Sequence, residues 1–352
     1  MKILTVVGAR PQFIKAAAVS RPLRQRHREI LLHTGQHYDE AMSDRFFLEL
    51  DLPRPDIELG VGSGSHGQQT GRMLIGIENA IAEHRPDVVL VYGDTNSTIA
   101  GALSAAKMHV PVAHVEAGLR SFNRAMPEEI NRVVTDSLSS LLLCPSETAA
   151  ANLRREGITS GVHIVGDVMA DVLAKFGGAV NAPAVLAEHG VGEREYFVAT
   201  IHRAENTDDA SRLRAIVDAL SDLPAPVVFP AHPRVKAAMA AAGLRPGANV
   251  TVIEPLGYAS MIALVRNARA VLTDSGGLQK EAYWLGVPCV TLRDQTEWVE
   301  TVASGWNILT GANGSRIAAA AAAAAPRPDR PVLYGDGNTV AAIVDLLERQ
   351  SS

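Results

Sequence analysis

Three carboxylates in the first half of the chain occupy positions where they could act on a bound ligand. Asp94 and Glu116 each come directly after an apolar segment, and Glu128 opens a helical pattern after Pro127. A sheltered carboxylate can accept a proton or stabilise a positive charge. Structural alternatives exist for each. Asp94 could cap a helix, and Glu128 with Glu129 could be first-turn acids favoured by the helix dipole.

Two cations accompany the start of the first expected helix. Arg10 lies at its mouth and Lys15 about one turn further in, with Pro11 suited to the first helical turn. Cations beside the free N–H groups of a helix start favour an anion. The alternative is an ordinary strand–helix turn with solvated cations.

A glycine-containing turn in the second half is suited to a phosphate ligand. An apolar segment ends at Thr273, and Ser275, Gly276 and Gly277 then open a helix. Small residues let a ligand approach the backbone, so their N–H groups could hold a diphosphate. Glu281, one turn into the helix, could accept hydrogen bonds from ribose hydroxyls. The alternative is a turn without a ligand.

Two histidines, His202 and His232, stand at expected strand ends of the second half. The pattern His202-x-x-Glu205 lacks the second histidine of a zinc helix, and the sequence has no cluster of cysteines and histidines. It also lacks the Gly-x-x-x-x-Gly-Lys-Ser/Thr phosphate loop. We therefore expect no metal ion.

Short apolar segments that alternate with helical patterns would position these side chains. Expected strands cover residues 3–7, 29–33, 88–92, 112–115 and 141–144, and then 196–201, 227–230, 250–253, 270–273 and 288–292. Continuous apolar strands separated by helices predict an α/β protein with two Rossmann-like, doubly wound parallel sheets. We expect domains at 1–167 and 168–335, followed by a helix in 336–352 that packs on either domain.

The composition indicates which binding partners and which cellular compartment to expect. The chain has 352 residues and a net charge of −5, which argues against general binding of nucleic acid or acidic membrane surfaces. The two cysteines, Cys144 and Cys289, lie in apolar runs and are expected to be buried free thiols. No signal peptide and no membrane-length apolar run are visible, so a cytoplasmic protein is expected.

Seven motifs follow one another along the chain. They are Gly8-Ala9-Arg10-Pro11-Gln12, Thr34-Gly35-Gln36-His37, Gly93-Asp94-Thr95, His114-Val115-Glu116-Ala117-Gly118-Leu119-Arg120, Pro127-Glu128-Glu129-x-Asn131-Arg132, His202-Arg203-x-Glu205-Asn206 and Thr273-Asp274-Ser275-Gly276-Gly277. In these motifs the chain resembles the non-hydrolysing UDP-N-acetylglucosamine 2-epimerases nearly end to end. The resemblance implies the two-domain fold of B-type glycosyltransferases (GT-B), with UDP in a cleft that the domains face. It also implies a homodimer and a C-terminal helix that crosses back to the first domain.

The resemblance further implies a reaction and a set of roles. A base removes the proton on carbon 2 while UDP departs from carbon 1, and UDP then re-adds to the 2-acetamidoglucal; no metal or redox cofactor takes part. The implied catalytic residues are Asp94, Glu116, Glu128 and His202. The implied UDP-sugar ligands are Arg10, Lys15, Arg132, His232, Ser275, Gly276, Gly277 and Glu281.

The chain departs from the family pattern at three places. Many bacterial members carry two more residues before Pro-Glu-Glu than this chain has in segment 121–126. Members activated by a second UDP-N-acetylglucosamine usually have a second glutamine where this chain has Tyr38-Asp39. The Thr296-Glu297-Trp298 form also occurs in relatives that act on UDP-2,3-diacetamido-2,3-dideoxyglucuronate. That sugar, a hydrolysing reaction that releases N-acetylmannosamine, and a GT-B glycosyltransferase are the alternatives to epimerisation of UDP-N-acetylglucosamine.

Overall fold

The computed structural model describes residues 1–36, 52–176, 181–335 and 337–350, apart from the side chains of Arg10 and Phe176. The chain divides into two compact units, residues 1–172 with 332–352 and residues 173–331. The first division thus falls slightly later than the expected boundary after residue 167, and the last segment of the chain belongs to unit 1.

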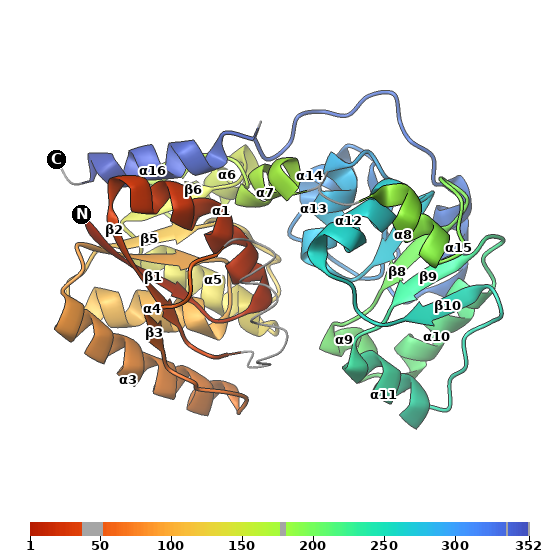
Figure 1. The fold of residues 1–352 in the computed structure, drawn as a ribbon, viewed down its shortest axis with the longest axis horizontal. Coiled ribbons are helices and arrows are strands. Elements are labelled where there is room, and N and C mark those ends of the chain that lie inside the picture. The colour runs from red at the N-terminus through yellow and green to blue at the C-terminus, as the bar shows by residue number, and fades with distance from the viewer. Residues whose placement is uncertain (37–51, 177–180, 336, 351–352) are drawn as a thin grey trace. The chain divides into compact units, whose positions relative to one another are not determined.

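Unit 1 contains a seven-stranded parallel sheet in the order β3-β2-β1-β4-β5-β6-β7 (Figure 1). Its strands are β1 (Lys2–Val7), β2 (Arg28–His33), β3 (Ile57–Glu58), β4 (Val88–Tyr92), β5 (Val112–Val115), β6 (Leu141–Cys144) and β7 (Val162–Ile164). Its helices are α1 (Arg10–Arg26), α3 (His66–His84), α4 (Asn96–Lys107), α5 (Pro127–Leu138), α6 (Glu147–Arg155) and α16 (Thr339–Arg349). Helix α7 (Val168–Phe176) contains the point of division.

Unit 2 contains a six-stranded parallel sheet in the order β10-β9-β8-β11-β12-β13. Its strands are β8 (Phe197–Thr200), β9 (Val227–Pro230), β10 (Val250–Ile253), β11 (Ala270–Thr273), β12 (Cys289–Thr291) and β13 (Asn307–Leu309). Its helices are α8 (Ala182–Glu188), α9 (Ala204–Thr207), α10 (Ala210–Ser221), α11 (Pro233–Ala241), α12 (Tyr258–Arg266), α13 (Gly276–Trp284), α14 (Val299–Ala303) and α15 (Gly314–Ala323).

The central strands are apolar on both faces because helices cover both faces of each sheet. In unit 2, Phe197 and Leu272 pack on the side of α10 and α15, whereas Val198 and Val271 pack on the side of α12 and α13. Successive strand residues point to opposite faces, so a doubly covered strand needs apolar residues throughout. The predicted α/β fold class, with two doubly wound parallel sheets, is confirmed.

Every expected strand is present, with ends shifted by a residue or two, but three strands were not predicted. These are β3, β7 and β13, which have two or three residues each and lie at sheet edges. Except for the buried Asn307, their side chains are exposed or half-buried, so their sequences lack a continuous apolar run.

The last helix, α16, lies beside α1 within unit 1 (Figure 1). Ile343, Val344 and Leu347 form its buried face. Arg26 of α1 pairs with Asp345 and Glu348 on its exposed side. Across the described ranges, no helix combines the length and the apolar character that crossing a membrane requires.

Candidate active site

The first candidate cluster lies at the carboxyl ends of β4 and β5, which are neighbours in the sheet of unit 1. β4 ends in a sharp turn at Gly93, whose φ is +61°. A Cβ atom at Gly93 would lie 3.4 Å from Glu116 Oε2 and 3.6 Å from Lys15 Nζ. The turn that carries Asp94 therefore passes directly beside an ion pair formed by two other predicted site residues.

That ion pair joins Lys15 of α1 to Glu116, and the two side chains are 9% and 10% exposed. Glu116 has a φ of +78°, a left-handed conformation that costs free energy for any residue with a Cβ atom. Its neighbours in the turn include Gly118, with a φ of +80°. The Glu116 carboxylate thus contacts Lys15 from a strained turn.

Asp94 is bound by Arg132 of α5. Arg132 donates from Nε and Nη2 to Asp94 Oδ2 at 2.9 and 2.6 Å. The Asp94 side chain remains 31% exposed. The helix-capping alternative does not describe Asp94, because Thr95 is the N-cap of α4.

The two adjacent glutamates at the start of α5 have different surroundings. Glu129 is buried and accepts hydrogen bonds from the N–H groups of Ser121 and Phe122 and from Arg132 Nη1. Glu128 is half-buried, and no hydrogen bond or ion pair joins its side chain to another described residue. Glu129 supports the loop, whereas the Glu128 carboxylate has no bond to a described neighbour.

A fully buried polar network beneath these turns was not assigned a role from the sequence. His114 Nδ1 lies 2.7 Å from Asp136 Oδ1, and His114 Nε2 lies 2.7 Å from the Gly93 carbonyl oxygen. Arg120 Nη1 and the Gly118 N–H donate to Asp136 Oδ2 at 2.7 and 3.0 Å. Burial alone would raise the pKa of Asp136, but its bonds to His114 and Arg120 hold that pKa below its usual value.

The second candidate cluster, in unit 2, is organised by Asp274 at the end of β11. This buried carboxylate accepts from the N–H groups of His202 and Arg203 at 3.0 and 3.1 Å, and from Asn206 Nδ2 at 3.1 Å. The His202 ring lies against the same carboxylate, with its side chain 49% exposed. Burial raises the pKa of Asp274, but the contacts with His202, Arg203 and Asn206 bring it below its usual value.

Helix α13 begins beside this cluster. Ser275 is its N-cap and accepts a hydrogen bond from the Leu278 N–H. A Cβ atom at Gly276 would lie 3.3 Å from Trp298 Nε1 and 3.8 Å from Arg203 Nη2, so only a small residue leaves the helix start open there. Glu281, which was predicted to contact ribose, is 8% exposed.

Two further predicted site residues are His232 and Arg10. His232 follows β9, is exposed, and caps α11 by accepting from the Arg234 N–H at 3.3 Å. Arg10 starts α1, but its side chain lies outside the described part of the chain, as do His37, Tyr38 and Asp39. Both cysteines are buried and free, as predicted.

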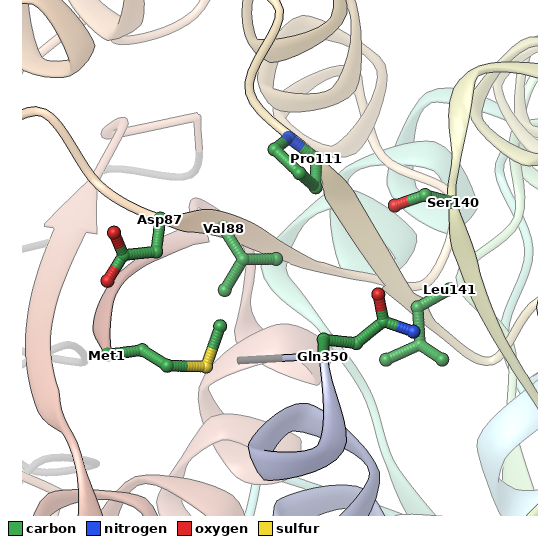
Figure 2. Close-up of a pocket in the computed structure, with 7 residues that line it drawn as sticks. All are labelled: Met1, Asp87, Val88, Pro111, Ser140, Leu141 and Gln350. Carbon is green, nitrogen blue, oxygen red and sulfur yellow. The ribbon is translucent and has the colours of Figure 1, made fainter. Parts of the chain in front are cut away.

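A small cavity of about 30 Å³ lies at the amino ends of β4 and β6 in unit 1, the edge of the sheet opposite to the carboxylates (Figure 2). Its lining includes Met1, Asp87 and Gln350 and none of the predicted site residues. Among the residues that the structure describes, no group of three or more histidine, cysteine, aspartate or glutamate side chains is arranged to hold a metal ion.

The fold is shared with sugar-nucleotide enzymes of known structure. The structure matches the Methanocaldococcus jannaschii UDP-GlcNAc 2-epimerase, solved in complex with UDP-GlcNAc and UDP, with a TM-score of 0.93 and 42% identity over 99% of this chain and 100% of that one. The Neisseria meningitidis enzyme bound to UDP-GlcNAc matches with a TM-score of 0.87 and 29% identity over 99% and 100%. The two Rossmann-like units and these structural matches assign the chain to the GT-B-like class that contains the 2-epimerases.

Within that class, residues 21–348 match the family model for UDP-N-acetylglucosamine 2-epimerase. The chain belongs to this family. It is 50% identical to a UDP-N-acetylglucosamine 2-epimerase homolog of Methanococcus maripaludis over 99% of both chains. It is also 50% identical to the UDP-2,3-diacetamido-2,3-dideoxy-D-glucuronate 2-epimerase of Pseudomonas aeruginosa, over 99% of this chain and 100% of that one.

Proposed function

We propose that this protein inverts carbon 2 of a UDP-linked 2-acetamido sugar by eliminating UDP and adding it back. The proposal is carried by one observation in unit 1. Two carboxylates, Asp94 and Glu116, lie at adjacent strand ends, and each is held by a cation. Fixed charges of this kind stabilise a transition state without reorganising during the reaction.

The proposed chemistry follows from the sugar. The proton on carbon 2 is hardly acidic because no carbonyl group is next to it. It leaves as the bond from carbon 1 to the UDP oxygen breaks, the C2–H electron pair forms the double bond of the glucal, and UDP takes the bonding electrons. Re-addition with protonation on the other face gives the epimer. Carboxylates beside the sugar stabilise positive charge at carbon 1 and exchange the proton.

The three carboxylates differ in their ability to exchange that proton. Asp94 and Glu116 are bound by Arg132 and Lys15, so protonating either one weakens an ion pair. Glu128 has no such bond to a described residue. We assign charge stabilisation to Asp94 and Glu116 and proton exchange on one face to Glu128, with a second group required on the other face.

Unit 2 is proposed to bind the leaving group. The start of α13 presents the N–H groups of Gly276 and Gly277, which favour an anion. His202 is half exposed and oriented by Asp274, so it can donate to a phosphate oxygen as UDP departs. A leaving group held in this way is retained for re-addition.

Two sugars are candidates. UDP-N-acetylglucosamine is the first, because the matched structures from M. jannaschii and N. meningitidis contain it. UDP-2,3-diacetamido-2,3-dideoxyglucuronate is the second. It is favoured by the 50% identity to the P. aeruginosa protein named for it, against 44% to the M. jannaschii protein named UDP-N-acetylglucosamine 2-epimerase.

Proton NMR in deuterated water tests the reaction and the sugar together. We expect one of the two nucleotides to give its 2-epimer with deuterium at carbon 2, and the ratio of kcat/KM values identifies the preferred sugar. Free N-acetylmannosamine with UDP would instead indicate the hydrolysing reaction. No change in either nucleotide would contradict the proposal and leave the glycosyltransferase alternative.

Substitution of the carboxylates tests the roles. Asp94→Asn and Glu116→Gln should each lower kcat about 100-fold or more while UDP still binds. Glu147→Gln is the matched control, because Glu147 is an exposed glutamate of the same unit that pairs with Arg154. Activity close to wild type in both D94N and E116Q would refute the assignment.

A further inference from the structure

The buried imidazole of His114 contacts two oxygen atoms, one from the Asp136 carboxyl group and one from the Gly93 carbonyl group. Its side chain and that of Asp136 are both fully buried. One ring nitrogen lies 2.7 Å from the Asp136 carboxylate and the other lies 2.7 Å from the Gly93 carbonyl oxygen. At these distances each contact holds a proton. The one at Gly93 belongs to His114 Nε2, because a carbonyl oxygen has none to give, and the one at Asp136 belongs to His114 Nδ1 when the carboxylate is ionised.

The proton at this contact lies on His114 rather than on Asp136, because bonds to His114 and Arg120 hold the pKa of Asp136 below its usual value despite burial. Asp136 Oδ2 already accepts from the Gly118 N–H and from Arg120 Nη1. Arg120 in turn pairs with Glu156 at 2.7 Å. The thiol of Cys144 on the neighbouring strand β6 is neutral, since burial raises its pKa to about 12. With His114 as a cation, two positive groups, His114 and Arg120, lie beside two negative groups, Asp136 and Glu156.

The same pair connects two separate turns. His114 holds Gly93, the residue before Asp94, through its carbonyl oxygen. Asp136 holds Gly118, two residues after Glu116, through its N–H. Both glycines have left-handed φ angles, and Glu116 between them is strained in the same region. One backbone hydrogen bond, from the Gly93 N–H to the Val115 carbonyl oxygen at 3.0 Å, also joins the two turns. The His114–Asp136 pair adds a side-chain link beyond the end of the strand pairing.

We propose that His114 is a positioning residue, held as a buried imidazolium by Asp136, that fixes the turn carrying Asp94 against the turn carrying Glu116. The role rests on the proposed function, because Asp94 and Glu116 are taken there as the groups that act on the sugar. His114 itself is fully buried and acts only through the two turns. Misplacing a reacting group by about 1 Å costs about 100-fold in rate, so a link of this kind controls kcat.

Two substitutions test separately the hydrogen-bonded link between the turns and the positive charge on His114. In His114→Asn the shorter amide can still donate to Asp136 but does not reach the Gly93 carbonyl, so the link breaks. In Asp136→Asn every hydrogen bond can be retained. The asparagine NH₂ group donates to a neutral His114 ring, and the other ring nitrogen still donates its N–H to the Gly93 carbonyl oxygen. The asparagine oxygen accepts from the Gly118 N–H and from Arg120. Glu29→Gln is the control, because Glu29 is a buried carboxylate of the same unit, bonded to Thr5 and Arg24 near the start of β2, away from both turns.

We expect H114N to lower kcat about 100-fold, with KM and the Kd for UDP within about threefold of wild type. D136N should lose less than about tenfold, and E29Q should keep its kcat. NMR of protein labelled with ¹⁵N-histidine should show two slowly exchanging ring N–H protons for His114 in the wild type and one in D136N. These signals do not depend on turnover.

Three results would overturn the proposal: a single ring proton on His114 in the wild type, an unchanged kcat in H114N, or equal losses of kcat in H114N and E29Q. The last would indicate general destabilisation. A wild-type protein that leaves both nucleotides unchanged would overturn the proposed function and the positioning role with it. The ring protons would still decide whether the buried cation exists.

Discussion

Replacing Asp274 by asparagine should destabilise unit 2 because the carboxylate is the common acceptor of its turn. Two backbone N–H groups, of His202 and Arg203, and the Asn206 amide all donate to it at 3.0–3.1 Å. Asparagine offers one oxygen in place of two and turns an NH₂ group toward a donor. A hydrogen bond to a charged group contributes about 1–2 kcal/mol more than a neutral one. Over these bonds we expect a loss of about 3 kcal/mol in the free energy of unfolding.

Tryptophan fluorescence during urea unfolding isolates the effect, since the three tryptophans, Trp284, Trp298 and Trp306, all belong to unit 2. A loss of about 3 kcal/mol corresponds to a midpoint lower by about 1–2 M urea. Asp209→Asn is the control: Asp209 is an exposed N-cap in the same unit, where asparagine caps about as well. An unshifted midpoint in D274N, or an equal shift in D209N, would refute the reasoning.

The effect of Asp274→Asn on the free energy of unfolding should depend on pH. The folded pKa of Asp274 is lowered, so its stabilising effect is complete above the unfolded value of about 3.9 and is lost as the pH falls through the folded pKa. The difference between wild type and D274N should therefore be constant near neutral pH and shrink in acid. A difference that grew below about pH 4 would contradict the assigned ion pair.

Two further predictions concern burial and backbone geometry. Burial raises the pKa of Cys144 and of Cys289 to about 12, so a thiol reagent at pH 8 should label neither cysteine in the native protein and both after unfolding; rapid native labelling would contradict their burial. Gly118→Ala should unfold at a lower temperature than Gly157→Ala. Both have left-handed φ angles, but a Cβ atom at Gly118 would lie 2.3 Å from the Ala149 carbonyl oxygen whereas Gly157 faces open space. Equal melting temperatures would show that φ alone sets the cost.

The strands that could be predicted are those whose burial leaves a continuous apolar run in the sequence. Central strands such as β4 are covered on both faces and therefore read as continuous apolar runs. The edge strands β3, β7 and β13 are short and partly exposed, and they form because a neighbouring strand offers hydrogen bonds rather than because their own side chains require burial. Local sequence carries little information about such pairing.

The placement of three candidate residues was predictable for a topological reason. Polar side chains directly after buried strands must lie at the carboxyl edge of a parallel sheet, so Asp94, Glu116 and His202 could be expected at such edges from position alone. The partner of Asp94 was not, since Arg132 comes from a helix much later in the chain and was named only through the family resemblance. Contacts of that kind depend on packing, which strand order does not determine.

The buried support was missed although it leaves a trace. His114 interrupts the apolar strand β5, and Asp136 lies in α5 on its buried side. A polar side chain in such a position is costly unless it is hydrogen-bonded, so each of these residues requires a partner. A histidine in one element and a carboxylate in the next can satisfy each other through a hydrogen bond, as His114 and Asp136 do. The polar interruption of an apolar strand therefore points to a buried partner, and here the resulting pair is bonded to the turns that carry Asp94 and Glu116.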